Sequence, residues 1–163
     1  MDIERIKNRV VDRGLAKKDR FEISIPGLSE DSNLLAKAAG VGELSIGFSP
    51  YRYTAPTSQH PNDLIHSDLS IEFYVDKRYN IRKEFQNWID EIVDLETGTF
   101  GYRDDYARDI RVRQMDANDD VMIETEYRSC VPRSIGELQS SFDASEELQT
   151  LIVTFIFNYY TIV

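Results

Sequence analysis

The chain has 163 residues, of which 41% are hydrophobic and 29% charged, and its formal net charge is −10. Domains commonly hold about 100–200 residues, so we expect residues 1–163 to form a single domain. Because the acidic balance repels phosphate, electrostatic capture of nucleic acid is not expected, although DNA could pass nearby without being held. The sequence has no apolar run of membrane-spanning length and no apolar signal-peptide region at its start, so we expect a protein made in the cytoplasm.

The first half of the chain predicts an amphipathic segment followed by strands. Within residues 1–20, apolar side chains recur on one helical face, which indicates a short helix or arm. Alternation of apolar and polar residues over 21–25 predicts a strand, and the same pattern over 44–48 predicts another. Residues 29–39 fit either a capped helix or a strand, and the sequence leaves that choice open.

A polar segment follows, from residue 49 to residue 68. It contains three prolines and no apolar period, which predicts a loop of about 20 residues, and such loops commonly bind a partner. Its aromatic and histidine side chains are the candidates for those contacts: Tyr51, Tyr53, His60 and His66. The histidines lie near Asp63 and Asp68, but the spacing is not that of a compact metal site, so we expect a solvated loop.

The centre of the chain predicts a strand, a helix and a hairpin. Strict alternation over residues 69–75 predicts the strand, and apolar spacings of three and four over 79–95 predict a helix that covers a sheet. Residues 108–128 are typical of a hairpin. We expect the register in which opposite charges face each other across the two strands, since each such pair stabilises the hairpin by roughly 0.2–1 kcal/mol. It gives two cross-strand pairs: Arg113 with Glu124, and Arg111 with Glu126.

The chain closes with an uncharged run, Leu151 to Val163, and a loop is predicted between Val131-Pro132 and this run. Its alternation predicts one long strand with an apolar face and a half-polar face. Solitary proteins usually protect sheet edges with charges, prolines or bulges. We therefore expect this run to lie inside a sheet or to pair with a neighbouring chain.

No pattern in the sequence predicts catalysis, a metal or a cofactor. The run that begins at Asp116 opens like a calcium loop but lacks the required glycine and the closing glutamate. Cys130 has no base near it in sequence, so a small buried residue is its expected role. The chain has no phosphate-binding glycine loop and no nucleophile elbow. We therefore expect a protein that is not an enzyme.

Three segments of the last third carry a resemblance to a known family. They are Ile110–Gln114 before the hairpin turn, Cys130–Leu138, and the run from Phe142-Asp143 through Glu147–Thr150 into the terminal strand. Weaker similarity covers the strand and helix of the centre. In these segments the chain resembles the tail tube proteins of contractile-tailed, myovirus-type bacteriophages.

The resemblance implies a mainly β fold (α+β), an antiparallel β-sandwich or half-barrel flanked by one α-helix. In that family, six copies form a ring whose inner sheets join into one continuous barrel, and rings stack into a tube inside the sheath. Residues 49–68 and 1–20 are the segments expected to reach the adjacent ring. The implied partners are further copies, the tail sheath protein, a baseplate tube initiator and a tube terminator, in a virion tail through which DNA is ejected.

An acidic lumen would explain the net charge, because a wall that repels phosphate lets DNA pass. The preferred lumen-facing candidates are Glu124 and Glu126, followed by Thr154 and Asn158. Ordinary exposed strand residues paired with Arg111 and Arg113 remain an open alternative for the two glutamates. Three other functions also remain open: a tube initiator or terminator of the same fold, a monomeric acidic protein-binding module, and an enzyme built on the acidic clusters or on His60 and His66.

Overall fold

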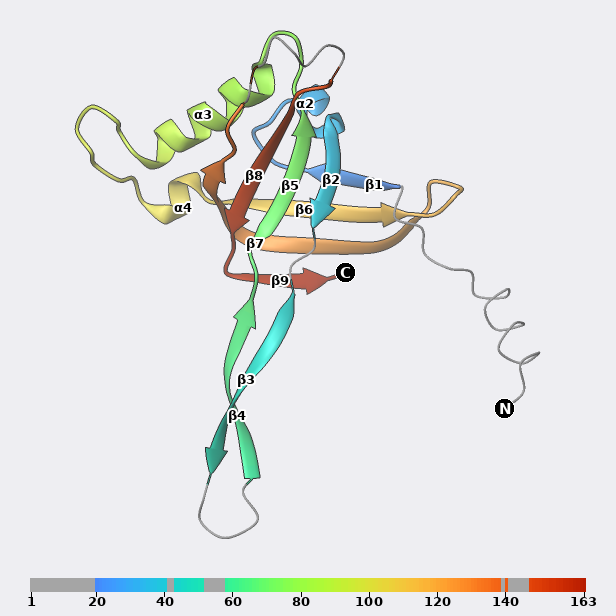
Figure 1. Cartoon of the computed structure of the whole chain (residues 1–163), viewed down its shortest axis with the longest axis vertical. Helices are drawn as coiled ribbons and strands as arrows, with labels where there is room; N and C mark the ends of the chain where they lie inside the picture. The colour runs from blue at the N-terminus through green and yellow to red at the C-terminus, as the bar shows by residue number, and fades with distance from the viewer. Residues whose placement is uncertain (1–19, 41–42, 52–57, 139, 141–146) are drawn as a thin grey trace.

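Two antiparallel β-sheets that share one bent strand form the body of the molecule (Figure 1). The computed structural model describes residues 20–40, 43–51, 58–138, 140 and 147–163. Sheet A contains, in order, β1 (Phe21–Ser24), β6 (Arg108–Met115), the first half of β7 (Val121–Ile135) and β9 (Tyr159–Ile162). Sheet B contains, in order, the second half of β7, β8 (Thr150–Ile156), β5 (Leu69–Tyr74) and β2 (Ala36–Gly40).

The core lies between the inner faces of the two sheets and helix α3 (Asn80–Ile92). Alternate residues of β5 and β8 supply one wall: Leu69, Ile71, Phe73, Leu151, Val153 and Phe155. From α3, Phe85 lies 5.3 Å from Phe73 and 6.0 Å from Phe155 between ring centroids. The buried Trp88 indole N–H donates to the Tyr106 carbonyl at 2.7 Å. The predicted single helix thus covers a sheet with its apolar face.

The helix is shorter at both ends than the predicted span of 79–95. Tyr79 has a left-handed φ of 57°, and the carboxylate of Asp76 accepts the Asn80 backbone N–H at 2.8 Å. Val93 is extended and pairs with Phe100 instead of continuing the helix. Apolar spacing extended the predicted helix past both ends, whereas the observed start is set locally by the Asp76 carboxylate, four residues before Asn80.

Residues 29–39 form both elements that the sequence left open. Ser29 caps the short helix α2 (Glu30–Leu34) by accepting the Ser32 N–H, and β2 follows directly. A second short helix, α4 (Arg103–Tyr106), lies between α3 and β6. None of the helices in the described ranges is long and apolar enough to span a membrane.

Strand β7 changes sheets at a corner and runs three residues further than the sequence predicted. The loop predicted after Val131-Pro132 begins three residues later, because β7 continues to Ile135 and pairs with β8. Ser129, with a left-handed φ of 56°, turns the strand, and its N–H donates to Asp109 at 2.9 Å. Arg103 fixes the corner by donating to both Ser129 and Asn158.

The predicted single strand over 151–163 is also wrong, because the run divides into β8 and β9. The break falls at Phe157 and Asn158, beside the corner of β7. The alternation of buried and exposed residues over Leu151–Phe157 follows the prediction. No proline, glycine or charge marks the break, and Asn158, a residue type common in turns, is the local signal that falls on it.

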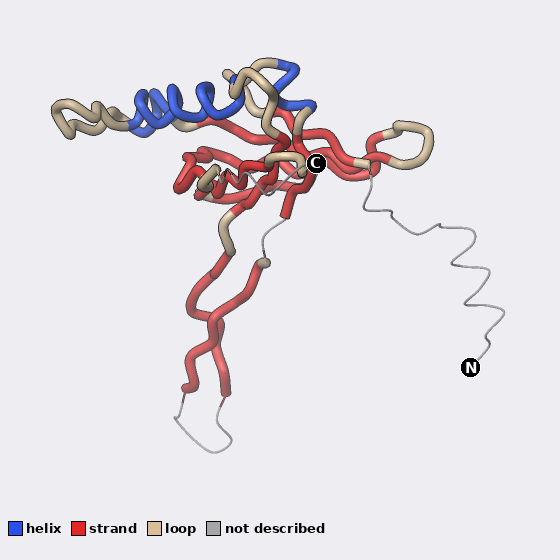
Figure 2. The backbone as a smooth tube through the Cα atoms, turned by 45° about the horizontal axis from the view of Figure 1, so that its top comes forward, coloured by secondary structure: helices blue, strands red, loops and turns tan. Residues whose placement is uncertain are grey.

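The remaining two strands leave the body as an arm (Figures 1 and 2). β3 (Leu44–Tyr51) and β4 (Ser58–His66) pair with each other as a separate two-stranded sheet. The prediction of a loop over 49–68 is therefore wrong for most of that segment. The prediction was wrong because Pro61 was taken as a sign of a loop. A proline is tolerated in a strand whose edge is open, and the register shift beside Pro61 accommodates one extra residue in β4.

Candidate assembly surfaces

The arm carries an apolar face that is exposed to solvent. Leu44, Ile46 and Phe48 alternate along β3 and so lie on one face, and Leu64 of β4 lies opposite Ile46. All four side chains are between 48% and 60% exposed. Apolar residues in a strand usually pack against a second layer. This face is therefore suited to contact another molecule.

The base of the arm is anchored on the body. The His66 ring stacks on Phe157, with centroids 4.4 Å apart and ring planes 20° apart. Glu43 and Ser67 clamp the two strands, since Glu43 N–H donates to Ser67 Oγ at 2.7 Å and Ser67 N–H to the Glu43 carbonyl at 3.0 Å. On the opposite face to Phe48, Tyr51 meets His60 edge to face at 5.6 Å. The His66 contact joins the arm to the body, the Glu43–Ser67 bonds hold its two strands together at the base, and the Tyr51–His60 contact lies towards its tip.

Of the four residues expected to bind through the predicted loop, three lie on the arm. Tyr51 and His60 are exposed on its polar face, and His66 is at its base. Tyr53 and the N-terminal segment 1–19 lie outside the described residues. Arg20, the last residue of the predicted N-terminal arm, pairs with Asp119 at 2.7 Å.

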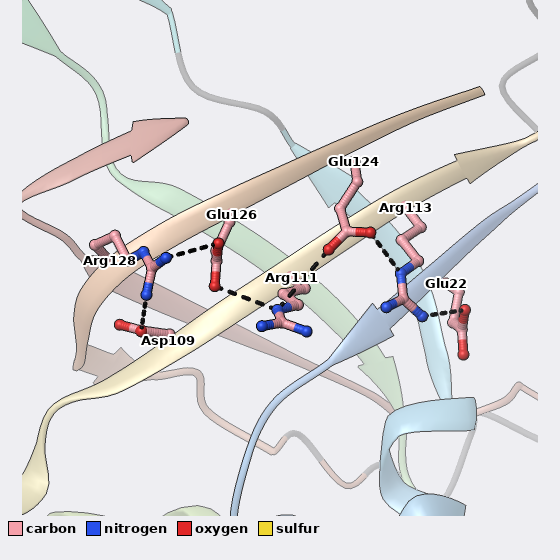
Figure 3. Close-up of polar contacts among 7 residues, drawn as sticks. All are labelled: Glu22, Asp109, Arg111, Arg113, Glu124, Glu126 and Arg128. Carbon is pink, nitrogen blue, oxygen red and sulfur yellow. Dashed lines mark hydrogen bonds and ion pairs between the residues drawn. The ribbon is translucent and has the colours of Figure 1, made fainter. Parts of the chain in front are cut away.

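The outer face of sheet A carries a row of alternating charges (Figure 3). Arg113 and Arg111 of β6 lie opposite Glu124 and Glu126 of β7, the register that the charge pattern indicated. The contacts run in series between four carboxylates and three guanidinium groups. The distances are Glu22–Arg113 3.5 Å, Arg113–Glu124 3.0 Å, Glu124–Arg111 3.8 Å, Arg111–Glu126 3.3 Å, Glu126–Arg128 2.9 Å and Arg128–Asp109 2.7 Å.

In this charge ladder, which runs from Glu22 to Asp109, the guanidinium groups neutralise most of the charge of the carboxylates. The Glu126 side chain is 8% exposed and is held by two arginines. Hydrogen bonding from the Ser129 N–H, followed by Arg128, lowers the pKa of Asp109. The hydrogen bond to Glu124 raises the pKa of Arg113, and that to Asp109 raises the pKa of Arg128. The ladder therefore joins β1, β6 and β7 and leaves little net charge on this face.

The outer face of sheet B is different: it carries hydroxyl groups and two ion pairs. Lys37 of β2 lies 3.1 Å from Glu72 of β5, and this hydrogen bond holds the pKa of Glu72 below its ordinary value. Arg133 of β7 lies 2.6 Å from Asp68, which precedes β5. Hydroxyl side chains share the face: Ser70, Ser134, Thr150 and Thr154.

Both edges of sheet B are open among the described residues, since no described strand pairs with the outer side of β2 or of the second half of β7. Each edge strand contains one extra residue where the register shifts, between Ala36 and Ala38 and between Pro132 and Ser134. Those extra residues are Lys37 and Arg133. Sequence patterns did not single out either residue, because a bulge is defined by the partner strand.

The lumen-facing candidates fall on different surfaces. Glu124 and Glu126 belong to the charge ladder of sheet A, while Thr154 lies on the outer face of sheet B. Asn158 is exposed at the break between β8 and β9, where its side-chain oxygen accepts from Arg103 at 2.9 Å. Which of these residues face a lumen stays a prediction.

Cys130, the one cysteine, is buried in the core. Burial raises the pKa of its thiol to about 12, and the Sγ–H donates to the Tyr127 carbonyl at 3.3 Å. The expected role as a small buried residue is confirmed. In the turn that opens like a calcium loop, Asp116 accepts the N–H groups of Asn118 and Asp120, as a turn-capping residue does.

Comparison with known proteins gives one family model and several similar chains. The model of the phage tail tube protein family matches residues 22–163. The tail tube protein gp19 of Enterobacteria phage T6 is 25% identical over 150 residues, which cover 89% of this chain and 90% of gp19.

Two solved structures are similar in fold. A chain of the PVC sheath-tube complex, from an extracellular contractile injection system, superposes with a TM-score of 0.72 at 12% identity and covers 96% of both chains. The tube terminating cap of the anti-feeding prophage gives a TM-score of 0.70 at 17% identity over 92% of this chain and 91% of the cap chain. At these identities, the likeness establishes the fold.

Proposed function

Because this chain belongs to the phage tail tube protein family, we propose that it is the major tube subunit of a contractile tail, and that six copies close into a ring and rings stack into a tube. Its role is that of a structural component of the virion tail. The observation that supports this proposed assembly is the direction of the arm relative to the strands of the two sheets (Figure 1).

The arm continues the strand direction of sheet B. β3 follows β2 along the chain and β4 leads into β5, and the arm extends from the end of the body where these strands meet it (Figure 1). The strands of sheet A run across that direction. If the arm reaches the adjacent ring, its length lies along the stacking direction, and so do the strands of sheet B.

Sheet B is then the sheet that lines the channel. Strands that run along a tube can pair side by side with those of neighbouring copies, whereas strands that run across it meet end to end. Within sheet B, each neighbouring pair is antiparallel, so β2 and the second half of β7 run in opposite directions. When β2 of one copy meets β7 of the next copy, the closing pair is antiparallel too, and the barrel is continuous.

This arrangement assigns roles to the remaining surfaces. The outer face of sheet B, with Thr154, lines the channel through which DNA passes, and Glu124 and Glu126 serve the charge ladder on a different face. The arm's apolar face contacts the adjacent ring. The sheath surrounds the tube, an initiator and a terminator bind its two ends, and synthesis takes place in the host cytoplasm.

Cysteine cross-linking tests which sheet closes the ring. In Ala38→Cys/Ser134→Cys, one new cysteine lies on each edge strand of sheet B. The buried Cys130 remains unreactive and needs no replacement. With a flexible bifunctional maleimide, we expect a ladder of covalent oligomers that ends at the hexamer.

The matched control places the cysteines on the edges of sheet A, in Ser24→Cys/Thr161→Cys. We expect no ladder from this variant. A ladder up to the hexamer from the control, with none from the sheet B pair, would contradict the assignment of sheet B as the channel wall. Sheet A would then line the channel, and Glu124 and Glu126 would face it. Monomers in both variants, at concentrations where the unmodified protein forms rings, would also count against sheet B.

A further inference from the structure

The wall proposed above contains two cations, and both are held by carboxylates. In the strands of sheet B, Lys37 and Arg133 are the basic residues on the outer face. The Lys37 ammonium lies 3.1 Å from Glu72, and the Arg133 guanidinium lies 2.6 Å from Asp68. The side chains between them are hydroxyls and the exposed apolar Ile152 and Ile156, none of which forms a charge-assisted hydrogen bond with phosphate.

The two cations are directed along the wall. Lys37 also lies 5.8 Å from the centroid of the Tyr74 ring on the same face. Arg133 and Asp68 come from the two sides of β8, so their contact crosses that strand, and the Phe155 side chain occupies its inner face. Each long side chain is therefore held against the sheet, Lys37 by a partner on the neighbouring strand and Arg133 by a partner on the far side of β8.

Without those partners, both groups would be effective phosphate ligands. An ammonium has three N–H donors and a guanidinium has five, and both bind phosphate with charge-assisted hydrogen bonds. The side chain of Arg133 is 64% exposed, so polyanions can reach it. Because every subunit of a ring would repeat the two cations, weak single contacts would add up along a DNA molecule in the channel.

We propose that Glu72 and Asp68 are the residues that keep the channel wall from binding DNA, by retaining Lys37 and Arg133 in ion pairs. This inference rests on the proposed function, since it takes sheet B as the wall. It differs from repulsion by an acidic lumen: the four groups carry no net charge together, and the wall is non-adhesive because its cations are already paired.

Isosteric replacement of the two carboxylates tests the proposal. In Asp68→Asn/Glu72→Gln the shapes remain and the charges that hold the cations are lost. Binding is measured with a short fluorescent DNA duplex, by anisotropy, at several salt concentrations. We expect affinity at low salt to rise by about tenfold or more, with a slope of log affinity against log salt steeper by about 2 than in the unmodified protein, one for each released cation.

Two further variants make the result specific. Adding Lys37→Gln/Arg133→Gln to the double variant should return binding to the level of the unmodified protein. Asp119→Asn releases Arg20 from an ion pair of 2.7 Å away from sheet B, and should change the slope by no more than about 1. Unchanged binding in a correctly folded double variant, or gained binding that survives removal of Lys37 and Arg133, would overturn the proposal.

Assembled tubes separate this inference from the proposed function. DNA held by the double variant inside a channel should resist a nuclease that is too large to enter. A second outcome is that the double variant binds DNA through Lys37 and Arg133 while the nuclease digests that DNA freely. In that case Glu72 and Asp68 do keep the two cations from binding DNA, but sheet B is not the channel wall. If binding is absent, the retention itself is wrong.

Discussion

The body and the arm use the same strand pattern with opposite outcomes. In β5, alternate apolar residues are fully buried between sheet A and α3. In β3, alternate apolar residues are about half exposed. The difference is the second layer: β5 has one within its own chain, and β3 has none among the described residues. Apolar alternation therefore predicts a face that becomes buried, but it does not say which molecule buries it.

The comparison separates two kinds of residue. Those that pack in the body should change the stability of the subunit, and those on the apolar face of the arm should change its assembly. Each prediction below tests that separation, from the largest expected effect to the smallest.

The largest effect is expected on the arm. In Ile46→Lys/Leu64→Glu, two residues that face each other across β3 and β4 lose their apolar character, while the opposite charges preserve the cross-strand pair. We expect stacked tubes to disappear from electron micrographs and rings to remain. The subunit's free energy of unfolding should change by less than about 1 kcal/mol, because both side chains are already exposed.

The matched control is Ser45→Lys/Ile65→Glu, one residue further along the same two strands and on the opposite face. Tube formation should suffer much less. Equal loss of tubes in both variants would mean that the apolar face is not the contact. A large fall in stability would mean that the arm packs on its own body.

In the body, the largest effect is expected at Trp88. Its side chain is fully buried, its N–H donates to Tyr106, and the Arg108 guanidinium lies 4.3 Å above its ring. Trp88→Ala should lower the free energy of unfolding by about 3–5 kcal/mol, measured by urea denaturation. Phe100→Ala, which removes an aromatic side chain that is 76% exposed, should cost less than about 0.5 kcal/mol. Similar costs would contradict the assigned core.

A smaller effect is expected in the charge ladder. Glu126→Ala leaves Arg111 and Arg128 without their shared, nearly buried partner, and should cost about 1–3 kcal/mol. Glu22→Ala removes an end of the ladder that is 47% exposed and should cost less than about 0.5 kcal/mol. Should the two variants be equally stable, the ladder would not hold sheet A together.

The smallest effect concerns Asp109 and depends on pH. The Ser129 N–H lowers the pKa of this carboxyl below its ordinary value of 3.8, so the folded chain favours the ionised form. The stabilisation is present above the unfolded pKa and is lost as the pH falls through the folded pKa. Because the side chain is partly exposed, Asp109→Asn should cost less than about 1 kcal/mol near neutral pH. The difference between the two proteins should shrink below about pH 4. A difference that grows in acid would contradict this sign.

Local sequence patterns predicted the elements whose partners are close in sequence. The β6–β7 register followed from Arg111, Arg113 and the two glutamates that lie 15 and 11 residues further along the chain. The strand at 69–75 and the core face of α3 followed from regular apolar spacing. The resemblance in the last third supplied the family, which composition and spacing could not.

The features that failed depend on contacts between distant segments. Strand β4 is an exception, because it pairs with the preceding strand β3 and was obscured by Pro61, which an open strand edge tolerates. The corner of β7 depends on Asp109 and Arg103. The two bulge cations, Lys37 and Arg133, acquire their roles only when β2 and β7 become the edges of one sheet. No local pattern contains that information.

The central claim is that sheet B lines the channel and the arm contacts the next ring. A cryo-electron microscopy reconstruction of assembled tubes tests it most directly. The account predicts a continuous antiparallel barrel in which β2 of each subunit pairs with β7 of its neighbour, with Lys37 and Arg133 on the channel wall beside Glu72 and Asp68. A channel lined by β1, β6 and β9, with the charge ladder facing the lumen, would contradict it.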